Sequence, residues 1–338
     1  MSSSLTGGGK HRGLWSFLAV LAAMGVIATA ARAQVANAIA AAERAFNAGN
    51  YAAAISALQP VATGGSSNAE ASYWLGRSYY EISDYDSSAA QLEKAVSLDP
   101  KNSLYQMWLG RAYGGKADRE RSFSLAKKVK KQFELAVSLN PSNLEARRDL
   151  EEFCLDAPWI VGGSKDEALE QVNAITAIDP VQGHLARATY DLKALKKPDD
   201  AEKEVRQALA SNPKTLSPYF EAADFFQSQN KPADMSAAIE AAARVSPNDP
   251  RLAFYRGVAA VLSNTNLADA ERNLKSYLAS TPERSDWPSH ASARNWLGRL
   301  YEAQGKRAEA AEQYRAALQL DPKLKDAETR LTRLEKPN

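Results

Sequence analysis

The chain has 338 residues, of which 45% are hydrophobic and 24% are charged, and its formal net charge is +2. A balance this close to neutral argues against a nucleic-acid binder, which needs a strongly basic surface. The single cysteine has no partner for an intramolecular disulfide bond.

The first 33 residues have the pattern of a bacterial secretory signal. A basic region containing Lys10 and Arg12 precedes the uncharged, mostly apolar residues 14–30, and Ala31-Arg32-Ala33 fits the small-x-small cleavage pattern before Gln34. The apolar run is slightly short for a membrane span of about 20 residues, so we expect cleavage, with an uncleaved inner-membrane anchor as the alternative. Cleavage removes three positive charges and no acidic ones, so the net charge falls from +2 to −1. We therefore expect a periplasmic or secreted protein with no nucleic-acid partner and no stable membrane span.

Beyond the signal, a four-residue box, Trp-Leu-Gly-Arg, recurs. It begins at Trp74, returns 34 residues later at Trp108, and occurs again at Trp296. A proline preceded by a short polar or β-branched residue recurs with similar spacing. Because a proline forces its predecessor out of the α region, each one should end a helix. These prolines are Pro100, Pro141, Pro180, Pro213, Pro247, Pro282 and Pro322.

The prolines also set a register for the helices before them. Counting back 12, 8 and 5 positions from each proline reaches an apolar residue in every case except Ser88. Positions spaced i, i+4 and i+7 lie on one face of a helix, so we expect all of them to be buried. The triplets are Ser88, Leu92 and Ala95; Val129, Phe133 and Ala136; Ala168, Val172 and Ile175; Ala201, Val205 and Ala208; Met235, Ile239 and Ala242; Ala270, Leu274 and Tyr277; and Ala310, Tyr314 and Ala317.

Each box places a glycine inside a helical pattern, which costs roughly 1 kcal/mol relative to alanine and indicates a close packing contact. Together with Leu75, Tyr79 and Ala95 at their spacing before Pro100, this pattern resembles the tetratricopeptide repeat, a 34-residue helix-turn-helix. One departure is that Trp74 falls two positions later than the family's usual aromatic, which leaves its packing role open.

The resemblance implies an all-α fold, a right-handed superhelical solenoid of about eight repeats over residues 35–324, with a charged capping helix at 325–335. Although 305 residues would ordinarily suggest two domains, a solenoid grows linearly, so we expect a single unit. The repeats lie near residues 35–68, 69–102, 103–143, 144–182, 183–215, 216–249, 250–290 and 291–324.

The third and fourth repeats are longer than the period. Their extra residues fall around Gly114-Gly115-Lys116 and in residues 157–167. Corresponding turns of a solenoid stack along one edge, so we expect these insertions to lie side by side. Lys116, Trp159 and Ile160 would then form a second contact edge for a partner; alternatively, Trp159 folds back over the neighbouring helix pair. Ser164 should begin the following helix.

No catalytic or metal-binding motif is present. Cys154 lies in the apolar segment Phe153-Cys154-Leu155, which is typical of a buried, inert thiol. His184 and His290, which remain after signal removal, lack zinc-site spacing, and no Gly-x-Ser-x-Gly, His-Glu-x-x-His or P-loop pattern occurs. We therefore predict a protein that is not an enzyme and that needs no metal or cofactor.

In the tetratricopeptide repeat family, one face of the first helices lines a concave groove. The arginine of each box would suit acidic or C-terminal carboxylate segments of a partner, because guanidinium binds carboxylates bidentately. The alternative is that these arginines pair with acids on adjacent helices, or with Glu81 in the case of Arg77. By resemblance, the groove residues are Tyr73, Arg77, Tyr80, Glu81, Met107, Arg111, Asn295, Arg299 and Glu302.

These features predict a non-catalytic interaction scaffold in the bacterial periplasm that binds peptide or protein segments in its groove. The alternative function is binding of envelope polysaccharide or peptidoglycan fragments as a subunit of an envelope assembly or export system. Sugar sites favour exposed tryptophans and tyrosines that stack on the rings, whereas a peptide site would use the arginines.

Overall fold

The computed structural model describes residue 29 and residues 32–63 and 68–336, so nearly all of the predicted signal lies outside the described residues. The described part is helical and contains no strand. None of the helices in it is both long enough and apolar enough to cross a bilayer.

The chain divides into two compact units at the junction between Pro100 and Lys101, whereas linear stacking predicted one. A repeat in a stack contacts mainly its immediate neighbours, so a stack can divide at any junction.

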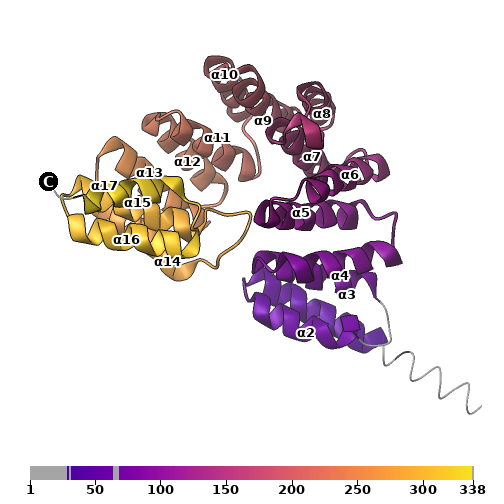
Figure 1. Cartoon of the computed structure of the whole chain (residues 1–338). Coiled ribbons are helices and arrows are strands. Elements are labelled where there is room, and N and C mark those ends of the chain that lie inside the picture. The colour runs from indigo at the N-terminus through magenta and orange to yellow at the C-terminus, as the bar shows by residue number, and fades with distance from the viewer. Residues whose placement is uncertain (1–28, 30–31, 64–67, 337–338) are drawn as a thin grey trace, which may run out of the picture. The chain divides into compact units, whose positions relative to one another are not determined.

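The first unit contains two antiparallel helix pairs (Figure 1). Residues 32–47 pair with α2 (Tyr51–Thr63), and α3 (Ala69–Glu81) pairs with α4 (Tyr85–Leu98). Phe46, Leu58 and Leu75 are fully or almost fully buried in its core.

The second unit continues with helix pairs (Figure 1). We call the first member of each pair the first helix and the next the second helix. The pairs are α5 (Ser103–Glu120) with α6 (Phe123–Leu139), α7 (Leu144–Asp156) with α8 (Lys165–Ile178), α9 (Pro180–Tyr190) with α10 (Pro198–Ala210), α11 (Ser217–Ser228) with α12 (Pro232–Val245), α13 (Arg251–Ser263) with α14 (Leu267–Ser280), and α15 (His290–Ala303) with α16 (Arg307–Leu320). A 3-10 turn, η1 (Trp159–Val161), lies between α7 and α8; a π-helical turn, η2 (Asp191–Leu195), continues α9; and α17 (Lys325–Glu335) ends the stack. The predicted all-α repeat fold is confirmed.

The proline rule and the packing register are both confirmed. Each helix before one of the seven prolines ends two or three residues ahead of it. Every register residue, Ser88 included, is at most 6% exposed. Ser164 begins α8 as predicted, because its hydroxyl accepts a hydrogen bond from the backbone N–H of Glu167.

The expectation that Gly114-Gly115-Lys116 enlarges the turn between the two helices of the third repeat is wrong, because these residues lie inside α5. The extra length of the third repeat lengthens both helices of the pair, and α5 ends at Glu120, with Arg121 after it in the left-handed conformation. Packing along α6 therefore outweighs the low helix propensity of the two glycines. At the fifth repeat, α9 begins at Pro180 and not near Gly183, because the Asp179 side chain caps the helix.

The box glycines lie where the two helices of a pair approach most closely. A Cβ atom on Gly110 would lie 2.5 Å from the ring of Phe133, and one on Gly298 would lie 2.4 Å from the ring of Tyr314. On Gly76 it would lie 2.6 Å from Cγ of Leu92. Phe133, Tyr314 and Leu92 are the central members of their register triplets. The glycine of the box and the central residue of the triplet are therefore the two partners of one contact.

This contact predicts opposite effects for two glycines of the same helix. Gly110→Ala should lower the free energy of unfolding by about 1–3 kcal/mol, because the new methyl group overpacks the buried Phe133 ring. Gly114→Ala should raise it by roughly 0.5–1 kcal/mol, since its Cβ would meet only Val129 at 4.0 Å and alanine favours the helix. Urea denaturation of the two variants measures both changes, and shifts of the same sign would contradict the packing role of Gly110.

Candidate functional site

The arginine of each box stacks on the tryptophan three residues before it. The guanidinium carbon of Arg77 lies 4.9 Å from the ring centroid of Trp74, and that of Arg111 lies 4.7 Å from the ring centroid of Trp108. In Arg299 over Trp296 it lies 3.8 Å away. The tryptophan thus holds its arginine by a cation–π contact, a role that its unusual position in the sequence left open.

The box arginines also have polar partners, on a neighbouring helix for Arg111 and on its own helix, α3, for Arg77. Arg111 Nε donates to Asp149 at 2.6 Å, and its Nη2 donates to Asp149 and to Glu145, all between α5 and α7. Arg77 donates to the hydroxyl of Tyr73 at 3.1 Å. Pairing with acids of adjacent helices was the alternative to partner binding, and Arg111 pairs in this way.

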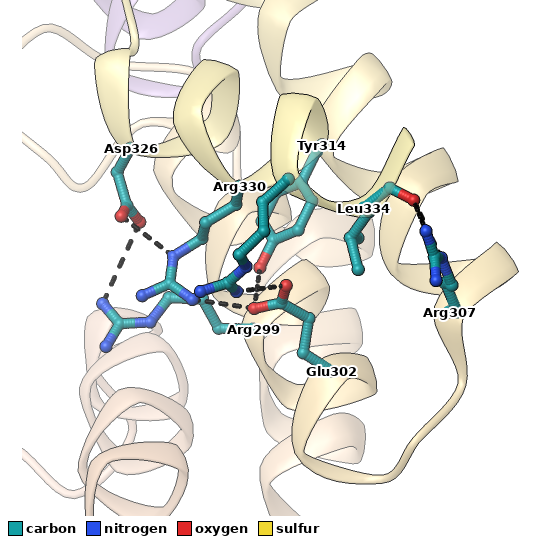
Figure 2. Close-up of polar contacts among 8 residues, drawn as sticks. Arg299, Glu302, Arg307, Tyr314, Asp326, Arg330 and Leu334 are labelled. Atoms are coloured by element: carbon teal, nitrogen blue, oxygen red, sulfur yellow. Dashed lines mark hydrogen bonds and ion pairs between the residues drawn. The ribbon is translucent and has the colours of Figure 1, made fainter. Parts of the chain in front are cut away.

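At the other end of the chain, α17 engages the predicted groove residues of α15 (Figure 2). Asn295 donates to Asp326 at 2.8 Å, and Arg299 lies 4.0 Å from the same carboxylate. Glu302 accepts hydrogen bonds from Tyr314, Arg330 and Arg333.

Burial of Glu302 acts to raise the pKa of its carboxyl, but these three donors outweigh it and hold the pKa below its usual value. The capping helix therefore occupies the polar groups that the sequence assigned to a partner.

The remaining predicted groove residues differ in their exposure. Met107 has none of its surface exposed and Tyr73 only 5%, so Met107 contributes packing, which corrects its assignment to a contact surface. Tyr80 and Glu81 are half-buried, and the Tyr80 ring packs edge-on against Tyr85.

The loop between α7 and α8 exposes its apolar tip. Trp159 is 83% exposed and Ile160 is 52% exposed, so the alternative in which Trp159 folds back is wrong. The loop is held from α6, because Lys130 Nζ donates to the carbonyl of Gly162 at 3.0 Å and pairs with Glu167 at 2.6 Å. Lys116, which was predicted to share this contact edge, lies in α5 and pairs with Glu120.

Two adjoining hollows lie along the first helices of the second unit. One, of about 430 Å³, is lined mainly by α7, α9, η2 and α11. The other, of about 370 Å³, is lined by α11, α13 and residues 285–292. Glu221 and Asp224 line both, so we treat the two hollows as one surface, which we call the acidic groove. Their volumes fall in the range of ligand sites.

Acids outnumber bases in the acidic groove. Its bases are Arg148, Lys193 and Arg251, and its acids are Glu151, Glu152, Glu221, Asp224 and Asp286. Arg148 bridges α7 to α11, because it donates to Glu151 at 3.3 Å and to Glu221 at 3.0 Å. This bridge passes over the fifth repeat, whereas repeats in a stack ordinarily contact only their neighbours, and it identifies this side as concave.

Glu151 is the most deeply placed acid of the groove. Only 1% of its surface is exposed, and no donor among the described residues lies within hydrogen-bonding distance of its Oε1. Burial raises the pKa of the Glu151 carboxyl to about 7, against the opposing effect of Arg148.

Asp224 is open to solvent yet surrounded by the walls of the groove. This partial desolvation raises the pKa of its carboxyl, although the Tyr255 hydroxyl donates a hydrogen bond to it at 3.1 Å.

Sequence reasoning missed this groove because it contains none of the boxes. The signal that could have found it is a pair of charged residues at i, i+3 on each of two first helices: Arg148 with Glu151 on α7, and Glu221 with Asp224 on α11. The π-helical turn η2, which carries Lys193 into the groove, left no recognisable mark.

The other chemical features of the described residues offer no competing site. Cys154 is 2% exposed, as predicted, and burial raises the pKa of its thiol to about 11. No cluster of potential metal ligands occurs in the described part of the chain. A larger hollow of about 600 Å³ near α10 and α12 has no buried polar side-chain atom without a partner among its described lining residues.

Comparison with known proteins agrees with the repeat architecture. A family model described as tetratricopeptide repeat matches residues 39–103, 75–121 and 260–324. With the helix pairs and glycine contacts described above, these matches confirm the predicted tetratricopeptide repeats over residues 39–121 and 260–324. No curated protein matches the sequence.

Solved structures are similar in fold. A chain of the APC/C hetero-tetramer Cut9-Hcn1 is 11% identical, with a TM-score of 0.51, over 87% of this chain and 55% of that chain. A tetratricopeptide repeat protein from Parabacteroides merdae is 15% identical over 79% of this chain and 99% of that chain, with a TM-score of 0.49. MamA is 20% identical over 50% of this chain and 92% of that chain, with a TM-score of 0.40. The tetratricopeptide repeat fold indicates an interaction scaffold with protein partners.

The raised pKa of Glu151 makes stability depend on pH. A carboxyl with a raised pKa holds its proton more tightly in the folded chain, so its favourable contribution is fully present below about pH 4.5 and is lost as the pH rises through 7. Glu151→Gln, which mimics the protonated acid, should therefore raise the free energy of unfolding at pH 8 by at most about 3 kcal/mol, and with it the melting temperature. At pH 4.5 the substitution should change both quantities little.

The matched control is Glu170→Gln, on an exposed position of α8, which should change stability little at either pH. Thermal melts of both variants and the parent chain at the two pH values measure the effect. A Glu151→Gln variant with the same shift at pH 4.5 and pH 8 would contradict the raised pKa.

Proposed function

We propose that this protein is a non-catalytic scaffold of the bacterial periplasm that binds a segment of a partner protein in the acidic groove. The observation that carries the proposal is the pair of adjoining hollows formed by four successive first helices, with charged groups beside apolar walls. Leu185, Leu192 and Phe225 supply such walls in the first hollow, and Phe220, Tyr255 and Trp287 supply them in the second.

The box arginines suggested an acidic partner segment, but their contacts in the structure argue against one. Arg111 is paired with Asp149 and Glu145, and Arg299 lies near Asp326. A carboxylate ligand would have to displace these internal acids. The acidic groove, by contrast, has carboxylates to offer to a ligand.

The periplasmic part of the proposal is supported by the order of basic, apolar and small residues before Gln34. We expect cell fractionation to recover the protein in the periplasm and N-terminal sequencing to begin at Gln34. Recovery of Met1 on membrane-bound protein would establish an uncleaved anchor instead.

A site-specific cross-linking experiment tests the binding surfaces. Because Cys154 is buried and is the only cysteine, a photoreactive group can be attached to a cysteine introduced at a surface position. Attachment at Ser228, which lines the groove, should cross-link a partner from envelope extract, whereas attachment at Ser276, exposed on α14, should not. Equal yields from the two positions would contradict a groove-directed partner.

The exposed Trp159 supports a second contact, since a loop tryptophan on a rigid scaffold is a common anchor at interfaces. It is also the observation that favours the alternative of an envelope glycan ligand, because sugar rings stack on exposed tryptophans. Trp159→Ala should leave the melting temperature nearly unchanged and weaken capture of the ligand. Separate analysis of the protein and glycan fractions that are captured decides which of the two ligands it contacts.

A further inference from the structure

We propose that the acidic groove receives a lysine or arginine side chain of the partner segment, whose cationic group lies between Glu151 and Asp224. This inference rests on the proposed function, since it assumes that the groove binds a polypeptide. It specifies the chemistry of that polypeptide as cationic, opposite to the acidic partner that the box arginines suggested.

The first hollow has more negative than positive charge. It is lined by four acids, Glu151, Glu152, Glu221 and Asp224, and two bases, Arg148 and Lys193. Both bases are already engaged: Lys193 pairs with Asp156 at 2.6 Å, and Arg148 is shared by two acids. Asp224 forms no ion pair with any described residue.

A second and independent observation is the unsatisfied oxygen of Glu151. Its Oε2 accepts from Arg148, while its buried Oε1 has no donor among the described residues. A buried acceptor without a partner destabilises the fold, and more so when it is charged, so native structures rarely retain one without a reason. An ammonium or guanidinium group supplies both the missing donor and the missing charge.

The walls of the hollow suit the rest of such a side chain. Leu185, Leu192 and Phe225 present apolar surface along the same hollow. Lysine and arginine bury their methylene stems against apolar groups and keep the charged end near polar ones.

Protonation of Glu151 is the competing explanation for its unpartnered oxygen, and the two explanations differ in their dependence on pH. The charged groups that face Glu151 are Arg148 and Glu152 from α7, Lys193 from η2, and Glu221 and Asp224 from α11. A cation binds the ionised carboxylates, so affinity should rise between pH 6 and pH 8, by up to about tenfold for a carboxyl that titrates near pH 7. Protonation alone predicts no ligand and no such rise.

The test uses a library of random 12-residue peptides displayed on phage and selected on the full chain after signal removal, at pH 8. We expect the selected peptides to be enriched in lysine or arginine at one position. Ser228→Trp, an exposed substitution that obstructs the groove, should abolish the selection while the chain remains folded.

The decisive measurement is a double-mutant cycle on one selected peptide. Replacing its conserved cation with norleucine should weaken binding at least tenfold to the parent chain and little to the Glu151→Gln, Asp224→Asn double variant. Glu170→Gln serves as the control and should bind like the parent. Affinity for the cationic peptide should fall from pH 8 to pH 6, and affinity for the norleucine peptide should not.

The outcomes separate the two proposals. Selected peptides without a cationic preference, or a preference that survives in the double variant, would overturn the cationic site and leave the peptide groove standing. Failure to select any peptide that depends on an open groove would overturn both.

Discussion

Close packing of a glycine in the first helix against the middle of the second is the contact on which four of the described helix pairs depend, through Gly76, Gly110, Gly257 and Gly298. At Gly110 and Gly298 there is no space for even a methyl group. The approach that this permits buries the triplets on the second helices and leaves the tryptophan of the box beside its arginine. Helix propensity alone would disfavour glycine here, so tertiary packing explains the residue.

The same close approach determines where charged groups can go. Acids and bases on the first helices connect one repeat to the next, as Arg111 of α5 does with Asp149 of α7, and some on the second helices do so too, as Lys130 of α6 does with Glu167 of α8. In α5 these groups are satisfied within the chain, as Arg111 shows with Asp149. In α7 and α11 they are not, because Arg148 serves two acids and Asp224 has no cation.

Much of the fold could be predicted because its causes are local. Each of the seven repeat-closing prolines follows the end of a helix, and the register before it places residues such as Tyr277 and Tyr314 in the core from spacing alone. The prediction of an enlarged turn at Gly114 was wrong, because two consecutive glycines favour a turn only when no neighbouring helix packs against them, and here both lie inside α5. The candidate site was harder to predict from the sequence. Arg148 and Glu221 are 73 residues apart, and no local pattern shows that their helices face each other. The box arginines were correctly placed on the first helices, but their partners, Glu145, Asp149 and Asp326, belong to neighbouring helices that the box does not contain.

The π-helical turn after α9 affects how this groove could change in evolution. A turn of this kind holds an additional residue, because its hydrogen bonds run from i to i+5, as from the N–H of Lys196 to the carbonyl of Asp191. Deleting one residue within η2 would rewind it as ordinary helix and rotate the positions that follow by about 100°. Leu192 and Lys193 line the groove from this turn, so the balance of charge there can be altered by a single deletion without replacing any charged residue. The backbone winding of η2 therefore sets which side chains line the groove, and a chain that differs by one residue at this point should present a different arrangement of charges there.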